Sequence, residues 1–295
     1  MLKQAYHKLQ NWRNEKSKNY QLQSYINNGR KPWSEGYWLF KENLIREYIN
    51  DHNILKLFHD FSSLPQHYGE SIDERIVEYP WFISRINQGT SKLLDAGSTL
   101  NHSYILQHPS IKQKEITIST LEPEENCYWQ DKVAYVFSDI RNLPFKDNFF
   151  DEVASISTIE HIGMNNSVYS SNPVFNENNP FDFLQAVSEL KRVTRPEGKV
   201  YISVPYGKYT NFGWYQQFNA DMINKLIAEF APTKVIESYY CYQDGGWAIA
   251  DKQHCKDFEG FNPLDTKFFN PKSTQECAPD NAACSRAIAA LELWK

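Results

Sequence analysis

The stretch Lys92-Leu93-Leu94-Asp95-Ala96-Gly97 joins a short apolar run to a carboxylate and a glycine. A run of this length that ends in a turn residue is typical of a buried strand in a parallel sheet. Four more such runs follow, at Ile116–Thr120, Val133–Phe137, Glu152–Ile156 and Val200–Val204. Phe183–Val193, between the last two, has the apolar stripe of a helix. Strands that alternate with helices predict an α/β fold with a mostly parallel sheet.

The C-terminal part of the chain extends this pattern. Met222–Phe230 is predicted to be a helix, and Lys234–Tyr242 is a strand rich in β-branched and aromatic residues. This strand stops at the turn signal Asp244-Gly245-Gly246. Ser285–Trp294 is ambiguous, because its alanines favour a helix while its place in the pattern favours a strand. We therefore expect residues 91–295 to form a Rossmann-like, seven-stranded, mostly parallel sheet with helices on both faces.

Residues 1–90 form a separate, helical N-terminal region in this interpretation. Apolar residues recur at helical spacing from Leu2 to Phe61, with a break at Asn27–Pro32. A further helix is predicted over Ser71–Ile86, where Ser71 and Glu74 have the spacing of a capping box. We expect this region to form part of a lid over an acceptor site.

The composition is that of a folded globular protein. Of its 295 residues, 41% are hydrophobic and 23% charged, which excludes disordered and fibrous chains. No apolar run approaches the roughly 20 residues of a membrane span, and the first residues lack an apolar signal core, so we expect a cytoplasmic protein. The five cysteines include no Cys-x-x-Cys pair and are predicted to be free thiols. A zinc site of His254 with Cys255, Cys277 and Cys284 matches no metal-binding spacing, and no metal is predicted.

Charge is distributed unevenly along the chain. Residues 1–31 carry a formal charge of +6, whereas the remainder carries −11. Trp12, Tyr20 and Tyr25 lie among the cations of this basic arm. Such a mixture suits peripheral contact with an anionic membrane surface or with phosphate, and it is also typical of a solvated helix face. The acidic remainder argues against a nucleic-acid partner, and the oligomeric state is left open.

The residues that follow the predicted strands carry the candidate chemistry, because ligands bind beyond the carboxyl ends of strands in an open parallel sheet. These positions hold Asp95, Gly97 and Ser98 after the first strand, Thr120 and Glu122 at the second, Asp139 and Ile140 after the third, and Thr158, Glu160 and His161 after the fourth.

Three stretches resemble the class I S-adenosylmethionine-dependent methyltransferases, most closely the type-11 group that acts on small molecules. Leu93–Ser98 resembles the first motif of that family. Asp139–Phe145 with Asp147–Asp151 resembles the adenine-binding loop and the lead into the fourth strand. Glu189–Val193 with Arg195–Lys199 resembles the helix and turn before the fifth strand. The likeness covers about residues 71–294, and the three motifs occur in the family's order.

The resemblance implies S-adenosylmethionine as the cofactor and a role for each motif. Asp95, Gly97 and Ser98 would lie at its amino-acid end. Asp139 would accept from the adenine amine, while Ile140 would pack on the ring. A cap of the strand end is the alternative role for Asp95, and an Asx turn is the alternative for Asp139.

Two departures from the family pattern concern the cofactor site. The family continues its first motif as Gly-x-Gly, whereas Ser98 and Thr99 follow Gly97 here, and residues with a Cβ resist positive φ. The family's ribose-binding acid ends the second strand, where this chain has Thr120. Glu122 is the nearest carboxylate, so either residue is a candidate for the ribose. Thr158 completes the predicted cofactor residues.

The acceptor side is predicted from the fourth and fifth strands. His161 is the candidate base and Glu160 is expected to orient it or to line the pocket, with a histidine that only bonds to backbone as the alternative. The aromatic and amide-rich stretch after the fifth strand suits a polyhydroxylated ring. Its candidate substrate-binding residues are Tyr206, Trp214, Gln216 and Gln217, and ordinary aromatic packing is the alternative.

These residues predict an enzyme that transfers a methyl group from S-adenosylmethionine to a hydroxyl of a small-molecule or glycan-like acceptor. Methylation of nitrogen or sulfur in a small metabolite stays open. So does a non-catalytic binding protein with a degenerate fold, because the glycine motif is incomplete and Thr120 replaces an acid. A dinucleotide oxidoreductase is disfavoured, because the first turn lacks the glycines that admit a pyrophosphate.

Overall fold

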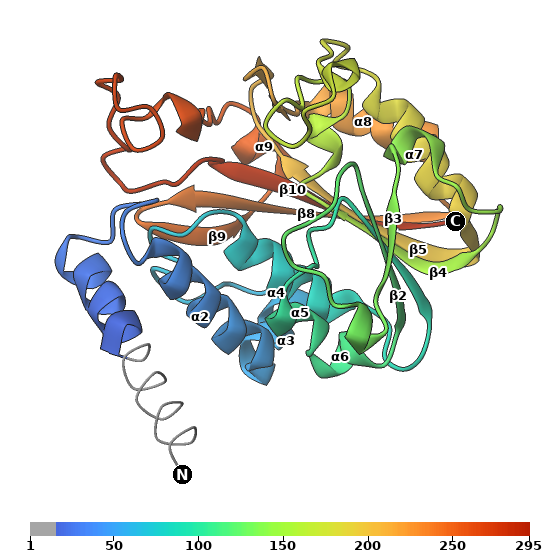
Figure 1. The fold of residues 1–295 in the computed structure, drawn as a ribbon, viewed down its shortest axis with the longest axis horizontal. Coiled ribbons are helices and arrows are strands. Elements are labelled where there is room, and N and C mark those ends of the chain that lie inside the picture. The colour runs from blue at the N-terminus through green and yellow to red at the C-terminus, as the bar shows by residue number, and fades with distance from the viewer. Residues whose placement is uncertain (1–15) are drawn as a thin grey trace, which may run out of the picture.

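A computed structural model describes residues 16–295, and its centre is an eight-stranded sheet in the order β3-β2-β1-β4-β5-β10-β8-β9 (Figure 1). β1 to β5 are parallel, whereas β10 runs antiparallel to both β5 and β8. The strands are β1 (Lys92–Ala96), β2 (Glu115–Thr120), β3 (Ala134–Phe137), β4 (Phe150–Ile156), β5 (Thr194–Pro205), β8 (Lys234–Gln243), β9 (Gly246–Ala250) and β10 (Ala287–Trp294). A separate small ribbon pairs β6 (Thr210–Asn211) with β7 (Gln216–Gln217).

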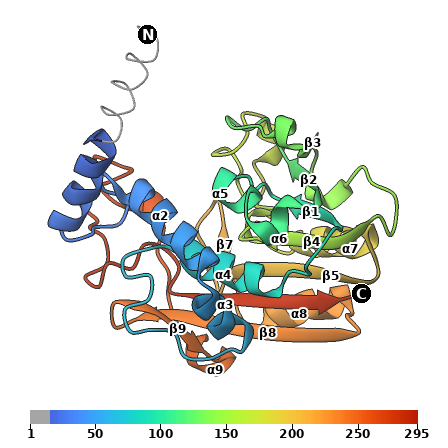
Figure 2. The same ribbon diagram turned by 90° about the horizontal axis from the view of Figure 1, so that it is seen from below.

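Helices cover both faces of the sheet, as Figures 1 and 2 show. One face carries α2 (Tyr37–Asn50), α3 (His52–His59), α4 (Arg75–Arg85), α5 (Ser103–Leu106) and α6 (Pro109–Lys112). The other face carries α7 (Phe183–Val193), α8 (Ala220–Phe230) and α9 (Lys252–Cys255). Residues 16–27 form a further helix ahead of α2. The predicted α/β class, with a mostly parallel sheet between two helical layers, is confirmed.

The N-terminal helices share a core with the sheet. Trp81 and Phe82 of α4 are buried and pack edge-on against Tyr201 of β5, with ring centroids 6.2 and 5.2 Å apart. The same apolar cluster includes Tyr37 and Ile45 of α2. Residues 16–90 therefore cover one face of the sheet. The division of the chain at residue 90 stays a prediction.

The sheet has eight strands rather than the predicted seven, because β8 turns back into β9. The turn consists of Asp244 and Gly245, whose φ angles are +51° and +75°. Two positive φ values match the twist of a tight hairpin, for which Asp-Gly is a preferred sequence. Trp247 of β9 is buried, and its Nε1 donates to the carbonyl oxygen of Ile72 at 2.9 Å. The hairpin thus holds the segment that leads into α4.

Three local expectations can be compared with the structure, and one of them is wrong. The predicted capping box is wrong, since Ser71 has a φ of +62°, its hydroxyl has no partner, and α4 begins only at Arg75. The ambiguous segment 285–294 is a strand, because β5 and β8 pair with it on both edges. The predicted break at Asn27–Pro32 is confirmed, since the helix of residues 16–27 ends there and α2 begins only after Gly36, whose φ is +85°.

The sequence also led to predictions about cysteines, membrane spans, metal sites and the basic arm. All five cysteines are free thiols in the structure. None of the helices described within residues 16–295 combines the length and apolarity that a membrane span requires, and this part of the chain has no cluster of three or more His, Cys, Asp or Glu side chains arranged for a metal. Within the basic arm, Lys3, Lys8, Trp12 and Arg13 lie outside the described residues. Membrane contact through this arm and the cytoplasmic location remain predictions.

A buried ion pair lies at the end of the sheet where β2 and β4 begin. Lys114 Nζ is 2.7 Å from Glu152 Oε2, and both side chains are fully buried. Glu152 also accepts from the backbone N of Asn87, from Ser91 Oγ and from Tyr201 OH. A buried carboxylate needs such partners. These contacts therefore connect the segment between α4 and β1 to β2, β4 and β5.

Lys114→Met is expected to lower the free energy of unfolding by about 3–5 kcal/mol, because it leaves Glu152 buried without its cation. Urea unfolding followed by circular dichroism measures the change. Lys112→Met is the matched control, since Lys112 is exposed two residues away and should change stability by less than about 0.5 kcal/mol. Equal stability of the two variants would contradict this role for the pair.

Candidate functional site

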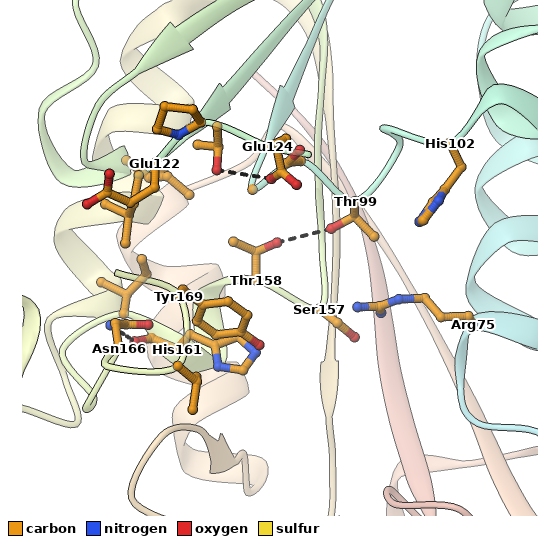
Figure 3. A pocket seen from close by; sticks show the side chains of 18 of the residues that line it. Arg75, Thr99, His102, Glu122, Glu124, Ser157, Thr158, His161, Asn166 and Tyr169 are labelled. Atoms are coloured by element: carbon orange, nitrogen blue, oxygen red, sulfur yellow. Dashed lines mark hydrogen bonds between the residues drawn. The ribbon is translucent and has the colours of Figure 1, made fainter. Parts of the chain in front are cut away.

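A cavity of about 440 Å³ opens at the carboxyl ends of β1, β2 and β4. The strand order reverses beside β1 at this edge, where ligands of open α/β sheets bind. Its wall includes seven of the predicted site residues, which are Gly97, Ser98, Thr120, Glu122, Ile140, Thr158 and His161. Figure 3 shows the side chains of the lining converging from several elements.

The turn after β1 brings two loops into close contact. Gly97 has a φ of +123°, and a Cβ there would overlap the side chain of Thr158. Only glycine allows both the conformation and the approach. Ser98 adopts a left-handed φ of +63° despite its Cβ. Thr99, which stands where the family has its second glycine, is not among the residues of positive φ, so its position does not require glycine. The Ser98 hydroxyl is buried and has no partner within the described chain.

Opposite charges lie on opposite sides of the cavity. Figure 3 places Glu122 and Glu124 on one side and Arg75 on the other. Glu122 accepts from Ser170 Oγ at 2.6 Å, and Glu124 accepts from Thr120 Oγ1 at 3.3 Å. Each carboxylate therefore keeps capacity to accept further hydrogen bonds. The cavity is suited to a ligand with donors at one end and an anionic group at the other.

Arg75 is held by a carboxylate beneath the cavity. Its Nη1 donates to Glu78, which is fully buried and also accepts from Ser157 Oγ at 2.6 Å and Ser203 Oγ at 2.7 Å. Among residues 16–295, no other nitrogen of the Arg75 guanidinium donates to a protein acceptor. The side chain of Arg75 therefore presents oriented, unused donors to the cavity.

His161 lies in the wall of the cavity with a defined tautomer. Its Nδ1 is 2.8 Å from the carbonyl oxygen of Trp214, which can only accept, so Nδ1 carries the proton and Nε2 keeps a lone pair. The rings of Tyr169 and Trp214 each lie 5.2 Å from the imidazole. Burial lowers the pKa of His161 to about 4, with a smaller effect from Arg75. The imidazole is therefore neutral at physiological pH.

Glu160, the second predicted catalytic residue, does not line the cavity. Its side chain is 2% exposed, and Oε1 lies 4.0 Å from His161 Nε2, beyond hydrogen-bond distance. Its Oε2 has no partner in the described chain, and burial raises the pKa of this carboxyl well above its ordinary value. Glu160 thus lies near His161 Nε2 without a hydrogen bond to it.

The two predicted aspartates support loops at the edge of the cavity rather than lining it. Asp95 is fully buried and accepts from the backbone N of Leu100 at 2.8 Å, and burial raises its pKa to about 7. Asp139 accepts from the backbone N of Arg141 at 2.8 Å and pairs with its guanidinium at 2.6 Å. Both therefore hold turns whose next residues face the cavity, and direct cofactor contact by either stays a prediction.

The predicted substrate residues lie largely within the protein. Tyr206, Gln216 and Gln217 are buried, and their side chains donate to backbone carbonyl oxygens of Lys252, Pro180 and Lys208 respectively. Trp214 donates from Nε1 to Asn262 and stands behind His161. None of the four lines the cavity, so a substrate role for them stays a prediction.

Sequence reasoning missed residues that come from outside the strand ends. Arg75 and Tyr79 belong to α4, His102 precedes α5, and Asn166 and Tyr169 follow the loop after β4. The sequence did contain one signal for the residues of α4. Arg75, Glu78 and Tyr79 are spaced to share one face of a helix that is otherwise apolar, and a polar cluster on a buried face needs partners.

Comparison with known proteins finds one matching family model. Residues 113–202 match the family model described as a methyltransferase domain. This segment of the chain has the sequence pattern of a methyltransferase domain. The match runs from the start of β2 to within β5 and contains two of the three stretches that carry the resemblance. It confirms the predicted S-adenosylmethionine-dependent methyltransferase of type-11 character, and with it the enzyme class and the cofactor. No curated protein sequence matches the chain.

Several solved structures are similar to this methyltransferase. One is the Burkholderia thailandensis 1,6-didemethyltoxoflavin-N1-methyltransferase with bound S-adenosylhomocysteine, at 13% identity and a TM-score of 0.46, covering 86% of this chain and 88% of that one. Another is a Thermotoga maritima S-adenosylmethionine-dependent methyltransferase, at 12% identity and a TM-score of 0.41, covering 86% and 99%. The CurJ carbon methyltransferase has 13% identity and a TM-score of 0.40, covering 85% and 57%.

The pKa of His161 predicts a pH dependence of stability. In the unfolded chain a histidine titrates near pH 6.5, whereas in the folded state this one titrates at about 4. Between these values the unfolded state binds more protons, so the stabilising contribution is complete above pH 6.5 and is lost as the pH falls toward 4. We expect the wild type to lose about 1–2 kcal/mol more than His161→Gln between pH 7 and pH 5.

Urea unfolding at the two pH values tests this expectation. His52→Gln serves as the control, because His52 is exposed at the start of α3, and its pH dependence should follow that of the wild type. An identical loss of stability in the wild type and His161→Gln would show that His161 titrates normally in the folded state.

Proposed function

We propose that this methyltransferase acts on a hydroxyl group of a small, carbohydrate-like acceptor. The observation that carries the proposal is the polarised cavity, with Glu122 and Glu124 on one side, Arg75 on the other, and the neutral imidazole of His161 in the wall. A methyl acceptor that is a hydroxyl must lose a proton, so a site for it needs a base as well as a cofactor pocket.

The residues of the cavity fit the chemistry of S-adenosylmethionine. The cofactor supplies an electrophilic methyl group when it is bound. Glu122 would accept from the ribose diol, with Thr120 as the neighbouring alternative, and Ile140 would pack on the adenine. Arg75 would pair with the carboxylate at the amino-acid end of the cofactor, through those of its guanidinium donors that do not bind Glu78. The unpartnered hydroxyl of Ser98 is a further group that this ligand can satisfy.

His161 is the proposed base for the acceptor hydroxyl. The Trp214 carbonyl holds Nδ1–H, so the lone pair on Nε2 is the one available to receive a proton. Tyr169 and Asn166 lie beside it in the wall of the cavity. A pKa of about 4 keeps the imidazole unprotonated but also makes it a weak base, so its contribution depends on alignment with the acceptor.

Transfer of label from [methyl-³H]S-adenosylmethionine tests the acceptor class. The protein is incubated with a panel of neutral glycosides and sugar alcohols, and with amines and thiols of matched size. Labelling of the hydroxyl compounds supports the proposal, whereas labelling confined to amines or thiols contradicts it. S-adenosylhomocysteine that binds by calorimetry without any transfer across the panel would favour the non-catalytic binding protein.

Arg75→Met is expected to weaken the binding of S-adenosylhomocysteine about 10- to 100-fold, because a charge-assisted hydrogen bond to a carboxylate is lost. Binding of 5′-methylthioadenosine, which lacks the amino-acid end, should not change. Isothermal titration calorimetry with both ligands measures the difference. Equal weakening for the two nucleosides would mean that Arg75 only supports the pocket. Arg46→Met, on the exposed side of α2, is the control.

His161→Ala is expected to lower the turnover of an acceptor found in that panel by about 100- to 10,000-fold, the usual contribution of a general base. The dissociation constant of S-adenosylhomocysteine should change little, since the proposed role concerns the acceptor. His52→Ala controls for the loss of an exposed imidazole. Wild-type turnover in His161→Ala would remove this residue from the mechanism.

A further inference from the structure

A second cavity adjoins the first on the side of the N-terminal helices. It has a volume of about 360 Å³ and lies between the start of α2, the start of α4 and the residues that begin α5. Arg75, Tyr79 and His102 line both cavities. Figures 1 and 2 show α2 beside α4 and α5 in both views. A molecule in this second cavity would therefore lie next to the proposed cofactor site.

Aromatic rings form much of the wall of the second cavity. Trp33, Trp38, Tyr79 and Tyr104 all contribute. Trp38 is 57% exposed, although it packs 5.3 Å from the ring of Trp33. An exposed tryptophan at the wall of a polar cavity offers a flat apolar surface on which a ring can stack. The volume lies at the lower end of the range for small-molecule sites, which suits one ring.

Both cationic side chains in this wall are paired with a carboxylate. Lys41 pairs with Asp73, which also accepts from Tyr37 OH at 2.9 Å. Arg75 pairs with Glu78. Three carboxyl groups, those of Glu42, Asp73 and Glu74, face these two cations in the wall, so that positive and negative groups nearly balance. The wall therefore disfavours ligands with a net charge.

One acceptor in the wall lacks a donor. Glu74 Oε2 is buried and has no hydrogen-bond partner within the described chain. Burial raises the pKa of this carboxyl, with neighbouring carboxyls adding to the effect. His102 is also neutral, since burial lowers its pKa to about 4. A ligand hydroxyl can both donate to and accept from such groups, whichever proton they carry.

We propose that the cavity between α2, α4 and α5 binds a neutral, polyhydroxylated ring, with Trp38 as its stacking surface and Glu74 as a hydroxyl acceptor. Because it adjoins the first cavity, it would hold the part of the acceptor that is not methylated. That last step rests on the proposed function. The inference also gives the lid expected from residues 1–90 a specific role, because residues of this region would form a wall of the acceptor site.

Saturation-transfer NMR tests the binding site without cofactor or turnover. The neutral probes are the methyl glycosides of glucose, galactose and mannose, and myo-inositol. Glucuronate and glucosamine are the charged analogues, and cyclohexanol controls for apolar contact alone. We expect at least one neutral probe to give a signal that exceeds those of the charged analogues and of cyclohexanol by threefold or more. The absence of signal from all four neutral probes, or a stronger signal from a charged analogue, would overturn the assignment.

Variants locate the probe and separate this inference from the proposed function. Trp38→Ala and Glu74→Met should each lower the signal of the bound probe at least threefold, with melting temperatures that show both variants folded. Trp129→Ala is the control, because Trp129 is 67% exposed and lines neither cavity. An unchanged signal in both test variants would overturn the site. S-adenosylhomocysteine should bind Trp38→Ala as it binds the wild type, and failure of the wild type to bind it would overturn the proposed function alone.

Discussion

The buried carboxylate of Glu78 is the contact on which the site depends. It lies in α4, is fully excluded from solvent, and is shared by Arg75, Ser157 and Ser203. A carboxylate in such a place is tolerated only when donors surround it. Its donors come from the helix itself and from the ends of β4 and β5. The requirement to satisfy one group therefore positions the N-terminal helical layer at the edge of the sheet where ligands bind.

This contact explains why the cavity has walls from two distant parts of the chain. The strand ends contribute Gly97, Thr158 and the loop that carries His161, while α4 contributes Arg75 and Tyr79. At the opposite end of the sheet, the Lys114–Glu152 pair ties the exit of α4 to β2 and β4. With both ends of α4 held through buried carboxylates, its polar residues present a rigid surface to both cavities. Residues 16–90 thus take part in the fold and in the site together.

Much of the sheet could be predicted because its signals are local. Runs such as Leu93–Ala96 and the stripe of Phe183–Val193 reflect burial on both faces of a strand or on one face of a helix, and neither depends on a distant partner. The positions after the strands were informative for the same reason, since parallel strands bring their carboxyl ends to one edge. Gly97 and Ile140 were found in this way, and both line the cavity.

Other features depended on partners that lie far away along the chain. Tyr206, Gln216 and Gln217 have the composition of a sugar-binding loop, yet their side-chain donors bind backbone carbonyl oxygens, because buried donors bind whatever acceptors the fold brings near them. The strand character of Ala287–Trp294 came from pairing with β5 and β8 against its helical propensity. The primary structure was sufficient for the α/β order, the edge of the sheet that holds the first cavity and the likeness to methyltransferases, all of which follow from periodicity and from motifs of a few residues. The setting of Arg75, the orientation of His161 and the second cavity were decided only by packing, because each requires groups that are far apart along the chain to meet. Ser203 and Glu78 meet across 125 positions, and His161 meets the Trp214 carbonyl across 53.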